Sequence, residues 1–236
     1  MDESFKYGEL ENLNMKQLIP SLFVLMIVGC SDSIPIEASD TPSPDDLVAH
    51  SEEFRKEVIE VTDGVHVAVG YALANAILVE GDNSNIIIDT TGTIETAEEV
   101  KELFDEINSN PVGAIIYTHN HADHTYGATV FAEESNPEIY AHSSTGEYLS
   151  RVIGILRPII SSRSNRMFGN ALPKEEVENN GIGPFLEIGK GGRQTSLVYP
   201  TTKFDDFLEL NISGLDIQPV SYTHLRAHET DSYLVC

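Results

Sequence analysis

The order of apolar segments in the middle of the chain is the strongest constraint on its fold. A branched apolar run at residues 86–88 predicts one buried strand, and residues 112–117 (VGAIIY) predict a second. Between them, Thr96 as N-cap and Glu99 have the spacing of a capping box, and apolar residues follow at helical intervals. This strand–helix–strand order predicts an α/β fold built in layers.

Further strands and helices are predicted on both sides of this unit. The predicted helices are at 45–60, 127–134 and 143–168, the last interrupted by Pro158. The other predicted strands are at 65–69, 76–79, 139–141, 195–199, 207–210 and 215–220. A glycine-rich loop is expected at 181–192. Together these segments predict one domain over residues 45–220.

The composition excludes several classes of protein. The chain has 14 Lys and Arg against 38 Asp and Glu, a formal net charge of −24, so we expect no nucleic-acid partner held through its phosphates. A hydrophobic fraction of 41% is enough for a packed core. The two cysteines, Cys30 and Cys236, are far apart in the chain, which excludes a disulfide framework and a cysteine-based zinc finger.

The amino-terminal residues have the pattern of a secretion signal. A positive residue after Met15, an apolar run over 18–28 and Gly29 before Cys30 predict a signal peptide within residues 1–29. The apolar run is too short to span a bilayer, which takes about 20 residues. Because the residues before Met15 are acidic, we expect translation to start at Met15.

The end of this signal, Ile27-Val28-Gly29-Cys30, resembles the lipobox of bacterial lipoproteins. The resemblance implies that Cys30 is acylated and becomes the first residue of a periplasmic lipoprotein, held at the membrane only by its lipid. Residues 30–44 are rich in Ser, Pro and Asp and are expected to form a flexible tether. The alternative is an ordinary signal peptide in which the cysteine occurs by chance.

A dense group of histidines follows the second predicted strand directly, where functional side chains gather in α/β folds. Residues 118–124 (THNHADH) contain three histidines and one aspartate. Imidazole and carboxylate are ligands that suit zinc, and also iron or manganese. We expect His119 and His121 to chelate one ion, and Asp123 and His124 to chelate a second, so that the two ions share a hydroxide. The alternative is a polar surface loop that is rich in histidine.

The sequence HNHADH (119–124) resembles the HxHxDH motif of the metallo-β-lactamase superfamily, and residues 86–90 (IIIDT) resemble an earlier motif of that family. The resemblance implies an αββα sandwich with a site for two zinc ions, of which residues 45–220 cover only the N-terminal half. It also implies that Asp89 lies beneath the metals and orients their ligands by hydrogen bonds. The alternative is that Asp89 is a turn residue at a strand end.

Three segments are similar to the alkyl sulfatase branch of this superfamily: 75–80 (NAILVE), 117–124, and 162–169 (SRSNRMFG) within a helical insertion. The resemblance implies hydrolysis of a small anionic ester, a sulfate monoester of an alkyl alcohol, by hydroxide held between two zinc ions. It implies that Asp123 is a catalytic residue as well as a ligand, and that Arg163 and Arg166 clamp the sulfate. The alternative for both arginines is a solvated helix face or ion pairs with acidic residues. The side chain of Tyr126, just after the motif, is expected to pack in the protein interior instead of lining the site.

The last residues, 221–236 (SYTHLRAHETDSYLVC), resemble a translated sequencing adapter, and we interpret them as a non-native tail. His224 and His228 have the spacing of a zinc pair on a helix, but the family resemblance ends before them. In the alkyl sulfatases, further acidic and histidine ligands and a dimerisation region follow at this point. The resemblance therefore implies a truncated chain whose full-length form is a homodimer.

The predicted ligands give each of two ions two protein donors, whereas zinc takes three or four. We therefore expect little sulfatase activity and weak zinc binding from this chain, although its lineage is enzymatic. Two alternatives stay open at this point. One is a hydrolase of the same superfamily that cleaves a lactam, thioester or phosphodiester, and the other is a periplasmic lipoprotein that binds metal without catalysis.

Overall fold

The structure, a computed structural model, describes residues 44–173, 176–189 and 191–221. The predicted signal peptide, Cys30 and the tether up to residue 43 lie outside these ranges, as does the predicted tail after Ser221. Within the described ranges, no helix is long and apolar enough to cross a bilayer. The predictions for both ends of the chain therefore stay predictions.

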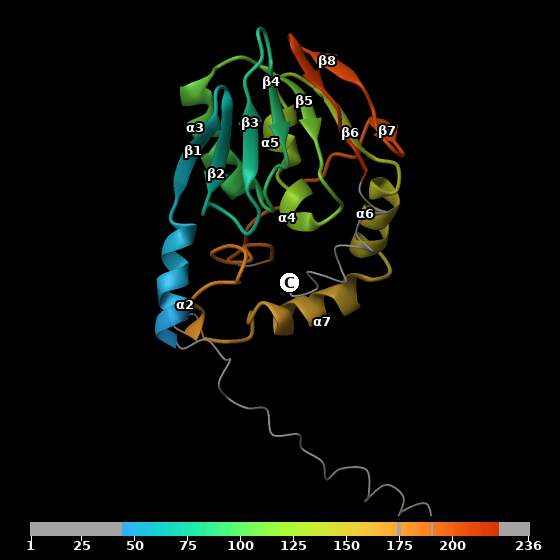
Figure 1. Ribbon diagram of the computed structural model, residues 1–236. Coiled ribbons are helices and arrows are strands. Elements are labelled where there is room, and N and C mark those ends of the chain that lie inside the picture. Colours follow the sequence, from blue (N-terminus) through green and yellow to red (C-terminus); the bar gives the residue numbers. More distant parts are fainter. Residues whose placement is uncertain (1–43, 174–175, 190, 222–236) are drawn as a thin grey trace, which may run out of the picture. The chain divides into compact units, whose positions relative to one another are not determined.

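A seven-stranded mixed sheet forms the centre of the fold, and its strands lie side by side in sequence order from β1 to β7 (Figure 1). The strands are β1 Glu57–Thr62, β2 Val65–Val69, β3 Ala76–Val79, β4 Asn85–Ile88, β5 Val112–Ile116, β6 Glu138–His142 and β7 Thr202–Phe204. The pairs from β1 to β4 are antiparallel, whereas those from β4 to β7 are parallel. A separate hairpin joins β8 (Leu210–Ile212) to β9 (Leu215–Ile217). The predicted α/β fold is confirmed.

Helices fill the connections between the parallel strands. They are α3 Ile94–Ile107 between β4 and β5, α4 Ala122–Thr125 and α5 Ala128–Ala132 between β5 and β6, and α6 Thr145–Ile153 and α7 Arg157–Met167 before β7. At the start of the described chain, α2 (Pro44–Ser51) is followed by the short 3-10 helix η2 (Glu52–Phe54). Pro158 lies in the first turn of α7, so it begins a second helix instead of interrupting one.

Apolar side chains pack on both faces of the sheet. On one face, α3 and α5 contribute Phe104 and Phe131, which are buried against the strands. On the other face, Ile86 of β4 and Ile116 of β5 pack with side chains of the β8–β9 hairpin. β4 and β5 are therefore held between two apolar layers, and their carboxyl ends form a rigid base for the loops that follow.

The predicted helix at 45–60 is wrong in its second half. Helical structure ends at Phe54, and residues 57–62 form β1, which pairs with β2 along the edge of the sheet. Val58 and Ile59 are branched and suit a strand, and pairing with β2 outweighs the helical spacing of the apolar residues.

The predicted capping box is also wrong, because α3 begins earlier than Thr96. The N-cap is Thr93, which has an extended backbone and accepts a hydrogen bond from the Thr96 N–H at 3.3 Å. Both residues are threonines, and the backbone conformation before the helix decides which of them caps it.

The end of the described chain pairs differently from the prediction. The predicted strand at 195–199 makes only a single bridge, from Ser196 to Gly127, and the strand β7 was not predicted. The last two predicted strands, 207–210 and 215–220, do form a hairpin, but with shifted and shorter bounds as β8 and β9, and Phe207 and Val220 make a single further bridge. In segments this short, apolar and polar residues alternate too few times to fix where a strand begins and ends or how it pairs.

Candidate metal centre

The histidine-rich segment lies at the carboxyl end of β5, beside the end of β4 (Figure 1). His121 is the extended N-cap of α4, and the His124 N–H donates to the His121 carbonyl oxygen at 3.1 Å. This tight turn folds the second half of the segment back towards the first.

Within this segment, the imidazole ring of His119 contacts the rings of both His121 and His124. The ring centroids of His119 and His121 lie 4.4 Å apart, and those of His119 and His124 lie 4.1 Å apart. Asp123 adds a carboxylate, with its Oδ2 3.4 Å from Nε2 of His124. The structure therefore gathers all four predicted ligands in one place, and we call these four residues the histidine cluster.

Asp89 connects the end of β4 to the histidine cluster. Its buried carboxylate accepts hydrogen bonds from the Thr118 N–H at 2.8 Å and the Thr118 hydroxyl at 2.7 Å, and its Oδ2 lies 2.6 Å from Nδ1 of His124. An ionised carboxylate only accepts, so Nδ1 of His124 carries the proton of this hydrogen bond. Nε2 of His124 is then the ring nitrogen that can bind a metal, which is the arrangement that carboxylates produce at zinc-binding histidines.

Opposing effects act on the charge of His124. Burial lowers the pKa of His124, whereas the hydrogen bond to Asp89 and the negative charges of Asp89, Asp123 and Glu187 raise it, and the net change is upward. The negative charges near His124 stabilise positive charge next to its ring, and a bound metal ion would supply such positive charge.

The histidine cluster suits a divalent metal by donor type but does not form a complete set of ligands. Imidazole nitrogens and a carboxylate are donors that zinc takes. Yet across the three described ranges, no group of three or more His, Cys, Asp or Glu side chains is arranged so that it could hold a metal ion. The cluster therefore fits zinc in donor chemistry and in the orientation of His124, and a stable site needs further ligands.

Glu187 is a buried carboxyl next to this site that the sequence pattern did not single out. Its side chain is fully buried, and burial raises its pKa, with the negative charge of Asp123 adding to the effect. It belongs to the segment predicted as a glycine-rich loop, where it stands between Leu186 and Ile188. Its position between two large apolar residues is the sequence feature from which its burial could have been predicted.

The predicted sulfate clamps are not brought into contact with the histidine cluster. Arg163 and Arg166 are exposed on α7, a helix with no buried residue, and neither makes a hydrogen bond or ion pair with the described part of the chain. A different arginine of this helix, Arg157, acts on Tyr126: burial raises the pKa of Tyr126, and the charge of Arg157 opposes this rise. A role for Arg163 and Arg166 in binding sulfate stays a prediction.

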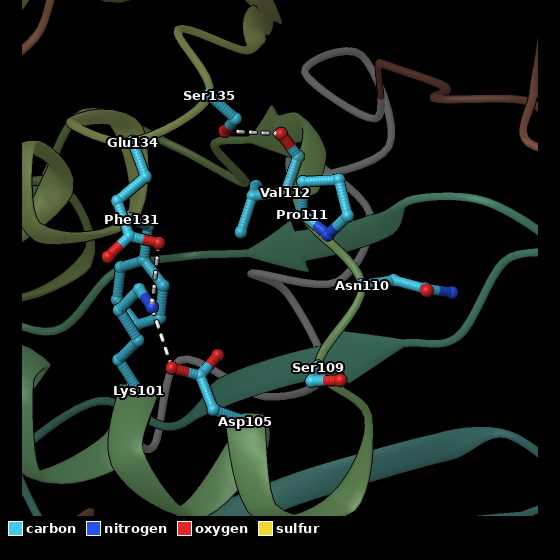
Figure 2. Close-up of a pocket in the computed structure, with 9 residues that line it drawn as sticks. All are labelled: Lys101, Asp105, Ser109, Asn110, Pro111, Val112, Phe131, Glu134 and Ser135. Carbon is cyan, nitrogen blue, oxygen red and sulfur yellow. Dashed lines mark hydrogen bonds and ion pairs between the residues drawn. The ribbon is translucent and has the colours of Figure 1, made fainter.

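A small pocket lies at the amino end of β5, at the opposite end of that strand from the histidine cluster (Figure 2). Lys101 in this pocket pairs with Asp105 at 2.6 Å and with Glu134 at 3.6 Å, and the Ser135 hydroxyl donates to the Val112 carbonyl oxygen at 2.6 Å. Because these polar groups bind one another, we place the candidate site at the histidine cluster instead.

Comparison with known proteins identifies the class to which this fold and site belong. Residues 69–225 match the Metallo-beta-lactamase superfamily, and the chain belongs to this superfamily. The matched range includes the first residues of the predicted tail, and the interpretation of 221–236 as non-native stays a prediction.

Several relatives of the chain are named alkylsulfatases. The chain is 29% identical over 165 residues to a linear primary-alkylsulfatase of Pseudomonas sp. strain ATCC 19151, a match covering 67% of this chain and 30% of the relative. A linear primary-alkylsulfatase of Pseudomonas sp. is 32% identical over 150 residues, which cover 61% of this chain and 22% of the relative. The solved structure of a stereoselective inverting sec-alkylsulfatase from Pseudomonas sp. matches with a TM-score of 0.65 and 20% identity, over 76% of this chain and 30% of that one.

These comparisons confirm the resemblance to the alkyl sulfatase branch, and by lineage the chain is a metallo-hydrolase. The matched region spans 30% or less of the length of these relatives.

Proposed function

We propose that the histidine cluster is the metal-binding part of a hydrolase that cleaves sulfate monoesters of alkyl alcohols. The observation that carries the proposal is the hydrogen-bonded group of Asp89, Thr118 and His124 at the carboxyl end of β5, next to the other donors. Relatives named alkylsulfatases favour a sulfate monoester over a lactam, thioester or phosphodiester as the substrate. Zinc is the proposed metal, and two ions per site are the number that the family resemblance implies.

The residues of this chain have distinct roles in such a reaction. Zinc bound here would lower the pKa of a water molecule, so that hydroxide is available near neutral pH. The histidine cluster would hold the metal through its ring nitrogens and its carboxylate. Asp89 keeps the proton on Nδ1 of His124, so that Nε2 is available to the metal, and it also fixes the Thr118 backbone from which the cluster begins.

The proposal predicts that zinc binding and sulfate release both depend on the histidine cluster. We expect weak zinc binding to the chain, because two donors per ion are fewer than zinc takes. His119→Ala should lower the affinity for zinc by about tenfold or more, as loss of even an outer support of a zinc site does. Calorimetric titration with zinc measures the affinity, and sulfate release from dodecyl sulfate measures the activity.

The control variant is His50→Ala, because His50 lies on α2 outside the histidine cluster. Nitrocefin, a thioester and a phosphodiester serve as competing substrates, and we expect slow turnover confined to dodecyl sulfate. Equal zinc affinity in His119→Ala and His50→Ala would contradict the proposed metal site. Faster hydrolysis of one of the competing substrates would contradict the proposed substrate.

We also propose that Cys30 carries the lipid of a periplasmic lipoprotein, on the basis of its lipobox-like sequence. When the chain is expressed in a bacterium with radiolabelled palmitate, the label should be incorporated, and Cys30→Ala should abolish it. Cys236→Ala is the matched control and should keep the label. Labelling that persists in Cys30→Ala would show that the signal is not of the lipoprotein type.

A further inference from the structure

Glu187 joins segments that are far apart in the sequence. Its Oε1 accepts a hydrogen bond from the Gly92 N–H at 3.1 Å, and its Oε2 accepts one from the Leu73 N–H at 3.4 Å. A fully buried carboxyl is tolerated only where hydrogen bonds of this kind replace water. Glu187 therefore binds the backbone of two other loops, one of which connects β4 to α3.

The loop that connects β4 to α3, residues 89–92, is also the part of the chain that supports the metal motif. Besides the carboxylate of Asp89, this loop contributes Thr90, whose N–H and hydroxyl donate to the His124 carbonyl oxygen at 2.8 and 3.1 Å. The Thr91 carbonyl oxygen accepts from the Gly127 N–H at 3.2 Å. The loop 89–92 is therefore hydrogen-bonded to the last turn of α4 and to the residue that precedes α5.

Two residues of this loop have a left-handed backbone conformation, which is unusual for residues other than glycine. Asp89 has φ of 59° and Thr91 has φ of 62°, both in the left-handed region, which aspartate tolerates but threonine, with its branched Cβ, rarely adopts. Such conformations persist only where the surrounding structure holds them. Gly92 follows Thr91, and a Cβ there would lie 2.6 Å from Oε1 of Glu187, so the carboxylate lies directly against the backbone.

We propose that Glu187 is a positioning residue for the metal centre: its carboxylate holds the loop 89–92 in the conformation that supports the histidine cluster. The inference rests on the proposed function, which makes the cluster a metal site. A role as a direct metal ligand is less favoured, because both oxygens of Glu187 accept backbone N–H groups.

The variants Glu187→Ala and Glu187→Gln test this role in the full chain. In the metal-free protein, the ring nitrogen and Nδ1–H signals of His124 in NMR spectra report its hydrogen bond to Asp89. Titration with cobalt(II) alone, followed by absorption, reports metal affinity. We expect Glu187→Ala to shift the His124 signals and weaken cobalt binding by about 10–100-fold. Glu187→Gln keeps one acceptor oxygen, so its His124 signals and its cobalt affinity should lie between those of Glu187→Ala and those of the wild type.

Phe104→Leu is the control for a general loss of stability, because Phe104 is a core residue at the far end of α3 from this loop. It should lower thermal stability without moving the His124 signals or the cobalt affinity. Unchanged signals and affinity in Glu187→Ala, or equal changes in Phe104→Leu, would overturn the inference. If Glu187→Ala does not fold, Glu187→Gln decides, because one backbone N–H still loses its acceptor. If the wild type binds no cobalt, the proposed function fails, and the metal-free His124 signals still decide the role of Glu187.

Discussion

Replacing Asp89 with asparagine is expected to lower the free energy of unfolding by about 1–3 kcal/mol, the range for leaving a buried hydrogen-bonding group without its partner. The amide group of asparagine offers one acceptor oxygen, whereas the Asp89 carboxylate faces the Thr118 N–H, the Thr118 hydroxyl and Nδ1 of His124. Asparagine tolerates the left-handed backbone of position 89 as aspartate does, so the loss comes from the side chain. Urea denaturation of the metal-free protein measures the change.

The same variant should weaken cobalt(II) or zinc binding by about 10–100-fold, because the tautomer and orientation of His124 are no longer held. Asp105→Asn is the matched control. Asp105 pairs with Lys101 on the surface, and an exposed pair of this kind contributes about 1 kcal/mol or less. If the two variants lose the same stability and the same metal affinity, Asp89 does not support the histidine cluster.

Gly127→Ala is expected to destabilise the fold by about 3 kcal/mol through overpacking alone. A Cβ at position 127 would overlap the Thr90 carbonyl oxygen and would lie 2.6 Å from the Cβ of Ala97. Neither atom is the end of a flexible side chain, so the backbone of the loop or of α3 has to move. Because Thr90 also donates to the His124 carbonyl oxygen, the movement should reach the histidine cluster.

Gly146→Ala in α6 is the matched control for this substitution. The nearest atoms to a Cβ at position 146 are 3.8 Å away, which is ordinary contact. Alanine is favoured over glycine within a helix by up to about 1 kcal/mol, so this variant should be neutral or more stable. Chemical denaturation and the NMR signals of the histidine rings compare the two variants. A Gly127→Ala protein as stable as Gly146→Ala would contradict the close packing between loop 89–92 and α5.

The centre of the fold and the histidine cluster could be predicted because both depend on local sequence. The branched run at 86–88 and the apolar residues at 112–117 belong to buried parallel strands, which have a continuous apolar pattern. The donors of the histidine cluster are close in sequence and follow the second of these strands, so a turn is enough to gather them. Asp89 could be predicted to support the ligands because residues 86–90, at the end of the first strand, resemble a second motif of the family.

The features that were missed depend on contacts between distant parts of the chain. Residues 57–62 form a strand because β2 is available for pairing, which outweighs the helical spacing of their apolar residues. Glu187 meets Gly92 across more than ninety residues of sequence, and nothing near Glu187 in the sequence indicates which backbone it binds. The place of Arg163 and Arg166 depends on how α7 is oriented, which a helical pattern does not specify.

The sequential order of the central sheet has a consequence for how the protein forms during synthesis. From β1 to β6, every strand pairs with its immediate predecessor in the chain, so each new strand is added to the existing edge of the sheet across a turn or a local helical connection. Low contact order of this kind favours rapid folding, and domains begin to form from the amino end as translation proceeds. The segment with the three imidazoles lies between β5 and β6, so we expect it to form when β6 pairs with β5, before α6 and α7 pack.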